Sequence, residues 1–276
     1  MAVTTGMIGH GFYNRHSAPQ WAATEYVLPW LEDAIGGMSF DGDAQAVGIA
    51  DFGCSEGANS MRVTKRLVEA IRARTAKPIQ SIHSDLPTND FTTLLCSLRT
   101  DGRPLFGETT YSAIVGGSMF NQLLPPATTH LAMTFNAIGF LSRKPVERLP
   151  GYILPNGPSA DRGVGKVTTD ERRVFAEQAA ADLEAFLRAR AAELVPGGTL
   201  LVEVFGAGDE ARTCDGIYDV LNDAVLEALD DGLIGKADYE AYYQPVYFRT
   251  LDERYGHFVN LGPLELELTA KPLDWR

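Results

Sequence analysis

Residues 47–59, V-G-I-A-D-F-G-C-S-E-G-A-N, decide the fold of this chain. An apolar run of strand-forming residues ends at Asp51, a turn bounded by Gly53 and Gly57 follows, and a helical pattern starts at Ala58. In α/β proteins, a strand, an acid, a glycine turn and a helix in this order bring backbone N–H groups close to a nucleotide-like ligand. The stretch therefore predicts a ligand-binding turn on a sheet of α/β type.

The same turn also fits a second pattern, the G-x-S-x-G nucleophile elbow of the α/β-hydrolases, with Ser55 as the nucleophile. Asp252 and His257 follow in the order that a catalytic triad would need, and His10-Gly11 could imitate an oxyanion-hole turn. However, an elbow of this kind sits late in its sheet. At most one strand precedes Ser55, because residues 12–35 have helical spacing. The position of the turn therefore disfavours a hydrolase, and Ser55 is expected to be a turn residue.

Strand and helix patterns alternate along the rest of the chain. We expect strands at 46–52, 79–84, 111–115, 129–135 and 199–205. Helices are expected at 12–35, 58–74 and 91–98, and a long one between the capping box Thr168-x-x-Glu171 and Pro196. Residues 150–166 read as a loop, and 209–255 as irregular and helical. This alternation predicts a mostly parallel sheet.

The composition limits the kinds of binding partner and the cellular compartment that are expected. The 276 residues carry a net charge of −12, which argues against nucleic acid as a partner because phosphate binding needs clustered Lys and Arg. Cys54, Cys96 and Cys214 are far apart and form no C-x-x-C, so a reduced, cytoplasmic setting without disulfides or a zinc site is expected. No apolar run is long enough to cross a bilayer, so no membrane partner is expected.

Two acids at strand ends indicate the ligand. A dinucleotide site has G-x-G-x-x-G and an acid about 20 residues further on. Here one acid, Asp51, lies inside the motif, and the next, Asp85, lies well past Gly57 at the end of the second strand. An acid at the first strand end suits an ammonium group and one at the second suits a ribose diol, so S-adenosylmethionine fits better than NAD. The alternative is a turn that only packs, with Asp51 capping the following helix.

Several stretches, in order, resemble one known family. Residues 51–60, D-F-G-C-S-E-G-A-N-S, resemble its D-L-G-C-S-S-G-P-N-T, and residues 85–91, D-L-P-T-N-D-F, resemble its D-L-P-G-N-D-F. Residues 116–125, G-G-S-M-F-N-Q-L-L-P, resemble P-G-S-F-Y-x-R-L-F-P. Further matches lie at Tyr13, Ser17 and Gln20, at 130–145, at 182–198 and at 245–253. The chain thus resembles the SABATH methyltransferases, which are the salicylate-type carboxyl methyltransferases.

The resemblance implies an α/β fold, a Rossmann-like class I methyltransferase sheet with helices on both faces and a helical cap. The expected core comprises residues 1–149 and 167–208. Residues 150–166 and 209–255 would form a cap over the acceptor pocket, and residues 256–276 would supply a C-terminal strand that returns to the core. Family resemblance also suggests a homodimer.

The activity implied is methyl transfer from S-adenosylmethionine to a small-molecule carboxylate, forming a methyl ester by direct displacement. A carboxylate is already an anion at neutral pH, so no general base is needed. By position, the residues expected around the methionine end of the cofactor are Tyr13, Ser17, Asp51, Gly53 and Asn59. Asp85 and Leu86 would hold the ribose and flank the adenine, and Ser118 and Met119 would contact the adenine. Gln20, Asn136 and Phe140 would orient the acceptor, with Gln20 bonding its carboxylate.

The chain departs from the family pattern at the acceptor. Phe140 stands where the family has a carboxylate-binding Trp, so one N–H donor is missing. Asn136 and Gly139 replace larger side chains, which predicts a more open pocket, and Ile8 replaces a Lys or polar residue. Family members usually run beyond this length. A hydroxyl or nitrogen acceptor and a non-catalytic cofactor-binding protein remain alternatives. His83 and His130, on strands, are expected to be core residues.

Overall fold

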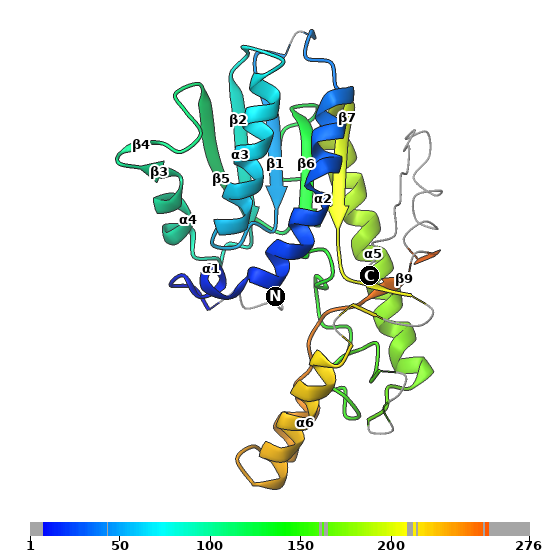
Figure 1. The fold of residues 1–276 in the computed structure, drawn as a ribbon. Coiled ribbons are helices and arrows are strands. Elements are labelled where there is room, and N and C mark those ends of the chain that lie inside the picture. The colour runs from blue at the N-terminus through cyan, green and yellow to red at the C-terminus, as the bar shows by residue number, and fades with distance from the viewer. Residues whose placement is uncertain are drawn as a thin grey trace.

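The computed structural model describes residues 8–42, 44–159, 162, 165–208, 212–213, 215–250 and 252–253. A five-stranded parallel sheet forms its centre, in the order β5-β2-β1-β6-β7 (Figure 1). The strands are β1 (Val47–Phe52), β2 (Ile79–Asp85), β5 (Thr110–Gly116), β6 (Thr129–Phe135) and β7 (Leu194–Glu203). All five predicted strands are confirmed. The C-terminal strand expected within residues 256–276, and His257, lie outside the described residues.

Helices cover both faces of the sheet because its strands are apolar on both sides. Odd-numbered strand residues such as Ile49, Leu131 and Met133 pack with α2 (Ala18–Gly37) and α3 (Ala58–Arg72). Even-numbered residues such as Ala50 and Ala132 pack with α5 (Thr169–Glu193). Side chains alternate between the faces of a strand, so each strand contributes to two cores. Figure 1 shows α2 and α3 in front of the sheet and α5 behind it.

The helix ends agree with the sequence except at the N-terminus. Thr168 and Glu171 form the predicted capping box of α5. The single helix expected at 12–35 is instead two helices, α1 (Phe12–His16) and α2, which meet at Ser17. Pro19 lies in the first turn of α2, where its fixed backbone angle favours a new helix start. The break bends the chain so that α1 lies below the carboxyl ends of the strands (Figure 1).

A second, smaller core lies beyond the carboxyl end of β7. It joins Leu141, Leu149, Tyr152 and Leu154 to Phe175 of α5 and to the segment 243–248. The predicted loop at 150–166 has no helix or strand where it is described, yet Tyr152 and Leu154 are buried. The helical character predicted for 209–255 is confirmed by α6 (Ile217–Asp230) and α7 (Lys236–Ala241). The α6 helix extends away from the sheet (Figure 1).

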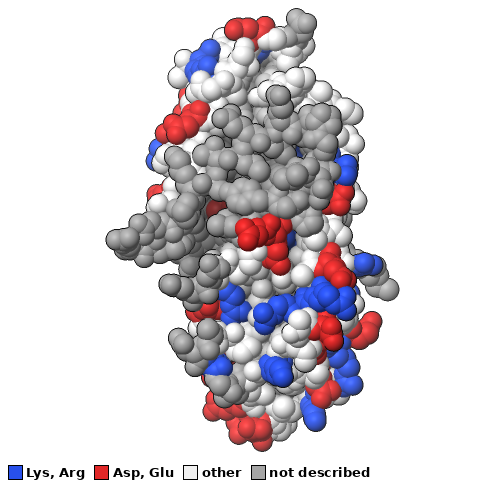
Figure 2. Space-filling view, turned by 90° about the vertical axis from the view of Figure 1, so that its right-hand side faces the viewer, with Lys and Arg blue, Asp and Glu red and all other residues white. Residues whose placement is uncertain are grey.

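Short elements complete the described part of the chain. These are α4 (Phe91–Ser97) and the two-residue strands β3 (Arg99–Thr100), β4 (Arg103–Pro104), β8 (Gly206–Ala207) and β9 (Arg249–Thr250). None of the described helices is both long and apolar enough to cross a membrane. On the face shown in Figure 2, a row of Lys and Arg side chains is bordered by Asp and Glu, so the coloured part of this face is not uniformly basic.

Candidate active site

The candidate site lies where the strand order reverses, between β1 and β6. The chain builds β2 and β5 on one side of β1 and then crosses to build β6 and β7 on the other. Ligands of open α/β sheets bind at the carboxyl ends of the strands at such a switch point. A pocket opens there, lined by Tyr13, Thr24, Asp51, Gly53, Cys54, Asn59, Ser60, Phe135 and Asn136. Five of the predicted site residues, Tyr13, Asp51, Gly53, Asn59 and Asn136, therefore line a single pocket.

The glycine turn is shaped by close packing. Gly53 has φ +94°, and a Cβ there would come within 2.3 Å of the Ala137 Cβ. Gly57 has φ +97°, and a Cβ there would come within 2.3 Å of a Leu94 methyl group. Only glycine satisfies both the left-handed backbone and the lack of space. Ser55, between them, also has a positive φ of 50°. The turn is thus packed closely against Ala137, which follows β6, and against Leu94 of the short helix at 91–97.

Asp85 binds this turn from the neighbouring strand. Its Oδ2 accepts a hydrogen bond of 2.6 Å from the Ser55 N–H, and its Oδ1 accepts one of 2.7 Å from the Leu86 N–H. Burial raises the pKa of the Asp85 carboxyl, and these two donors oppose the rise. Each carboxylate oxygen has a further lone pair that a ribose hydroxyl could use. The geometry is compatible with the predicted ribose role.

The D-L-P-T-N-D-F stretch joins three parts of the site. The Asn89 amide donates a hydrogen bond of 2.7 Å to the Ser55 carbonyl. Asp90 caps α4 by accepting from the Thr93 N–H, and its other oxygen accepts from the His10 N–H at 2.9 Å. The stretch therefore joins the glycine turn, α4 and the N-terminal segment. These contacts give Asn89 and Asp90 a structural role apart from any contact with a ligand.

Glu56 fixes the N-terminal segment over the turn. Its side chain is fully buried and accepts hydrogen bonds from the N–H groups of Gly11 (2.7 Å) and Asn14 (3.0 Å), at the start of α1. The Asn14 side chain in turn accepts from the Ala58 N–H at 3.0 Å. A carboxylate at a helix N-terminus is favourable because it meets unpaired N–H groups. In this stretch the sequence analysis singled out Asp51, Gly53 and Asn59 as site residues, and it missed the role of Glu56.

The predicted methionine-end residues contact one another. Asn59 donates from its amide to the Ser17 hydroxyl at 3.2 Å. A hydrogen bond from Asn59 also reaches Tyr13, although burial is the larger effect and raises the pKa of that phenol to about 12. Tyr13 comes from α1, Ser17 from the α1–α2 junction and Asn59 from the start of α3. The fold thus brings these side chains together, and their contact with the methionine end of the cofactor stays a prediction.

Buried carboxyl groups give the pocket an acidic character. Burial raises the pKa of Asp51 to about 7, with a further increase from the charge of Asp85 and an opposing hydrogen bond from Ser60. Burial likewise raises the pKa of Glu203, at the end of β7, to about 7. The charges of Asp51, Asp85 and Glu203 all contribute to the raised pKa of Tyr13. Asp51, which lines the pocket, is suited to a cation, because a cation beside it would stabilise its ionised form.

The segment after β5 holds the two residues predicted to contact adenine. The Met119 methyl group would lie 3.2 Å from a Cβ on Gly53, so Met119 borders the glycine turn. Ser118 is half-buried, and its hydroxyl accepts from the Phe120 N–H at 3.4 Å. A buried ion pair supports this segment from α5: Arg190 donates to the Met119 carbonyl at 2.8 Å, and Glu193 accepts from the Leu123 N–H at 2.6 Å. This support was not predicted.

The three residues expected to orient the acceptor differ in position. Asn136 lines the pocket with φ +59°, a left-handed conformation that Asn tolerates, and its side-chain oxygen is buried without a hydrogen-bond partner. Gln20, on α2, also has a buried side-chain oxygen without a partner. Phe140 is 39% exposed, pairs with Val246 and is not among the residues lining the pocket.

The structure also tests the expectations for Ser55, the possible nucleophile, and for the two strand histidines, His83 and His130. The Ser55 hydroxyl is buried and has no hydrogen-bond partner in the described structure, so no base activates it there. His83 is fully buried, and burial lowers its pKa to about 4, while its Nδ1 pairs with the Ser60 hydroxyl at 2.9 Å. His130 is also buried and accepts from the Gly48 N–H. Both are core histidines, as expected. Within the described ranges, no cluster of three or more His, Cys, Asp and Glu could hold a metal.

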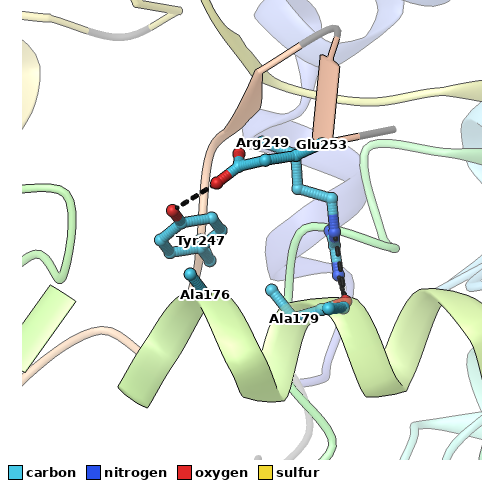
Figure 3. A pocket seen from close by; sticks show the side chains of 6 residues that line it. Ala176, Ala179, Tyr247, Arg249 and Glu253 are labelled. Carbon is cyan, nitrogen blue, oxygen red and sulfur yellow. Dashed lines mark hydrogen bonds between the residues drawn. The ribbon is translucent and has the colours of Figure 1, made fainter. Parts of the chain in front are cut away.

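A second hollow lies between α5 and the segment around β9 (Figure 3). Its lining includes Arg249, whose guanidinium donates to the Ala179 carbonyl at 2.8 Å and to the Ile138 carbonyl at 2.8 Å. Tyr247 donates to Glu253 at 2.9 Å (Figure 3). These polar groups are already engaged in joining α5 to the smaller core. The switch-point pocket is therefore the better candidate site.

Comparison with known proteins gives the fold and the family of the chain. A structure described as loganic acid methyltransferase with SAH superposes with a TM-score of 0.76 at 20% identity, over 92% of this chain and 75% of that one. The fold is therefore the Rossmann-like class I methyltransferase fold. A model of the SAM dependent carboxyl methyltransferase family matches residues 3–266, and the chain belongs to that family.

Two curated relatives show the range of the similarity. A probable jasmonic acid carboxyl methyltransferase of Theobroma cacao is 25% identical over 97% of this chain and 76% of its own length. Methyltransferase LUC1 of a Fusarium species is 27% identical over 90% of this chain. The chain spans 64% of the length of the Fusarium protein.

Proposed function

We propose that this protein transfers a methyl group from S-adenosylmethionine to the carboxylate of a small acid and so forms its methyl ester. The observation that carries the proposal is the acidic pocket at the switch point, where Tyr13, Asp51 and Asn59 lie together in a chain of this family. Asp51 is 3% exposed and its pKa is raised to about 7. A cation in the pocket would offset the free-energy cost of burying the charge of Asp51. The methionine end of the cofactor, with its ammonium group and its sulfonium, is such a cation.

The residues present fit this cofactor. Asp51 and Asn59 would hold the ammonium and carboxylate of the methionine part, and Asp85 would accept from the ribose hydroxyls. Met119 would pack against the adenine, beside the glycine turn. When bound, S-adenosylmethionine supplies an activated methyl group, which forms a bond to the acceptor oxygen as its bond to sulfur breaks and the electron pair returns to sulfur.

The work left to the protein is alignment and exclusion of water. A carboxylate needs no deprotonation at neutral pH, so no general base is required. Holding two reactants in line contributes on the order of 7–11 kcal/mol to a reaction of this kind. We propose that Gln20 and Asn136 orient the acceptor and that residues 150–166 and 209–255 cover it as a cap. The separate core beneath that segment, which includes Tyr152 and Phe248, supports a distinct covering unit.

Methyl-labelled S-adenosylmethionine incubated with the purified protein and a panel of carboxylic acids tests the proposal. We expect a labelled methyl ester, identified by mass spectrometry and lost on alkaline hydrolysis. A labelled product that survives alkali would instead indicate a hydroxyl or nitrogen acceptor, an alternative that the exposed Phe140 and the buried Glu203 favour. Cofactor binding by calorimetry without any labelled product would indicate a non-catalytic binding protein. Light scattering after size exclusion tests the expected homodimer.

A further inference from the structure

The proposed orientation of the cofactor indicates which strand ends meet the cofactor and which meet the acceptor. Asp85 at the end of β2 suits the ribose and Asp51 at the end of β1 suits the methionine part, so the cofactor would run from β2 toward β1. The transferable methyl group would then point toward β6 and β7, which follow β1 in the strand order. A side chain at the carboxyl end of β7 is therefore placed to meet the acceptor rather than the cofactor.

Glu203 is that side chain. It is the last residue of β7 and is in register with Phe135, which lines the pocket. Leu201, two residues earlier, packs into the core under α2, whereas Leu200 and Val202 pack with α5. Strand alternation therefore places Glu203 on the α2 face, the same face as Asp51. The backbone also links it to Asn136, whose N–H donates to the Glu203 carbonyl at 2.9 Å.

Glu203 has an unused polar atom. The residue is 8% exposed, and its Oε2 is buried with no hydrogen-bond partner in the described structure. Gln20 and Asn136, the two residues predicted to orient the acceptor, also have buried oxygens without partners. Buried polar atoms are almost always paired in the functional state. Amide oxygens only accept hydrogen bonds, whereas the Glu203 oxygen would carry a proton in the neutral form of its carboxyl group and could then donate. Glu203 is therefore the one of the three that an acceptor carboxylate could pair with through this oxygen.

The surrounding charges decide which form of Glu203 suits that ligand. Asp51 from β1, Cys54 from the glycine turn and Tyr13 from α1 line the pocket, and the charge of Asp85 at the end of β2 acts on both Asp51 and Tyr13. Gln20 on α2 and Asn136, directly after β6, are neutral. An ionised Glu203 in these surroundings would repel an acceptor carboxylate. A neutral carboxyl group would instead offer the donor that Phe140 lacks in place of the family Trp. Burial, which raises the pKa of Glu203 to about 7, favours this neutral form.

On the basis of the proposed function, we propose that Glu203 binds the acceptor as a neutral carboxyl group that donates a hydrogen bond to one oxygen of the acceptor carboxylate. The proton stays on Glu203 throughout, and the other carboxylate oxygen takes the methyl group. The acceptor loses its negative charge in the reaction, so this hydrogen bond is stronger in the ground state than in the transition state. Glu203 would therefore act mainly on the KM for the acceptor and less on kcat.

Two substitutions separate donation from basicity. Glu203→Gln keeps the shape and an N–H donor but cannot titrate or act as a base, and Glu203→Leu keeps only the bulk. Rates are measured with saturating S-adenosylmethionine, so that the cofactor cation holds Asp51 ionised, and with benzoate, cinnamate and hexanoate as acceptors. Glu184→Gln, on the exposed face of α5, is the control.

We expect the wild-type KM for the acid to rise about tenfold per pH unit above the pKa of Glu203, because the neutral fraction falls by that factor. Glu203→Gln should abolish this rise and keep kcat. Glu203→Leu should raise KM about 10- to 100-fold at pH 6, the loss of one hydrogen bond to a charged group.

Each opposing result has its own meaning. Loss of kcat in Glu203→Gln would overturn the proposal and make Glu203 a base for a hydroxyl or nitrogen acceptor. Wild-type behaviour in both variants would show that Glu203 does not meet the acceptor, while the proposed function would stand. Absence of any ester from the wild-type protein would overturn the proposed function, and this inference with it.

Discussion

The buried ion pair at the end of α5 gives the sharpest stability prediction. Arg190 and Glu193 are 0% and 1% exposed, and their side chains meet at 2.8 Å. Arg190 also lies 3.7 Å over the ring of Phe52. Removing one partner of a buried pair costs roughly 3–5 kcal/mol, because the other charge remains buried without compensation. Glu193→Gln should therefore lower Tm by roughly 10 °C, at about 2–4 °C per kcal/mol for a chain of this size.

The same substitution should weaken cofactor binding, because the pair fixes the segment predicted to contact adenine. Arg190 donates to the carbonyls of Met119 and Asn121 at 2.8 and 3.0 Å, and Glu193 accepts from two N–H groups of the same segment. We expect the Kd for S-adenosylmethionine to rise about tenfold, the equivalent of one lost hydrogen bond. Differential scanning calorimetry and titration calorimetry measure the two effects separately.

A matched control lies nearer the middle of the same helix. Glu184 pairs with Arg188 on the same helix at 2.8 Å, but both side chains are about half exposed. Exposed pairs contribute about 0–1 kcal/mol, so Glu184→Gln should leave Tm nearly unchanged. The double variant Arg190→Met with Glu193→Leu removes both charges and should recover most of the stability but not the cofactor affinity. Equal Tm values for Glu193→Gln and Glu184→Gln would refute the stability argument, and recovered affinity in the double variant would refute the positioning role.

Three further predictions concern the cofactor side of the pocket. The pKa of Asp51 is raised to about 7, so between about pH 4 and pH 7 the folded protein keeps a proton that the unfolded chain has released. The contribution of Asp51 to the free energy of unfolding is therefore full below about pH 4 and is lost as the pH rises to 7. Asp51→Asn should flatten that part of the stability–pH curve in thermal unfolding, and an unchanged curve would contradict the assignment. Asp85→Asn should weaken S-adenosylmethionine binding about tenfold by calorimetry through loss of a charge-assisted bond to the ribose, and an unaltered Kd would exclude that contact. Glu56→Ser should reduce hydrogen-exchange protection of the Gly11 and Asn14 amides about 10- to 100-fold with the sheet unaffected, and equal protection would show that Glu56 does not hold this segment.

The sheet was predictable because its signals are local. Each strand is a short apolar run closed by an acid, a glycine or a turn, and each helix has a clear apolar face or a cap such as Thr168. The break at Ser17 was missed, although Pro19 carried the signal, because the hydrophobic spacing continues across it. The burial of Tyr152 in the loop at 150–166 was missed because it depends on contacts with α5 and the segment 243–248, which no local pattern encodes.

The site was predictable where residues follow the strand ends, and less so elsewhere. Asp51 and Asp85 were found by one rule, an acid at the carboxyl end of a strand. The same rule applied to the fifth strand would have found Glu203, but the strand was expected to continue to 205, which placed Glu203 inside it. Glu56 and Arg190 had no such signal. Their roles arise from contacts with segments 45 and about 70 residues away in the chain.

The burial of Asp51 favours one of the two interpretations of the glycine turn, the ligand-binding one. If the turn only packed, Asp51 would cap α3, but the N-cap of that helix is Gly57, and the side-chain oxygen that accepts from the Ala58 N–H belongs to Asn14. A carboxyl group at 3% exposure whose pKa is raised to about 7 destabilises the ionised folded state. A residue that served only packing would be apolar at this position, since β1 is buried along its whole length. An acid is instead expected here if a cationic ligand pairs with it, which is the role proposed for Asp51, because strain of this kind is typical of sites built for binding rather than for stability.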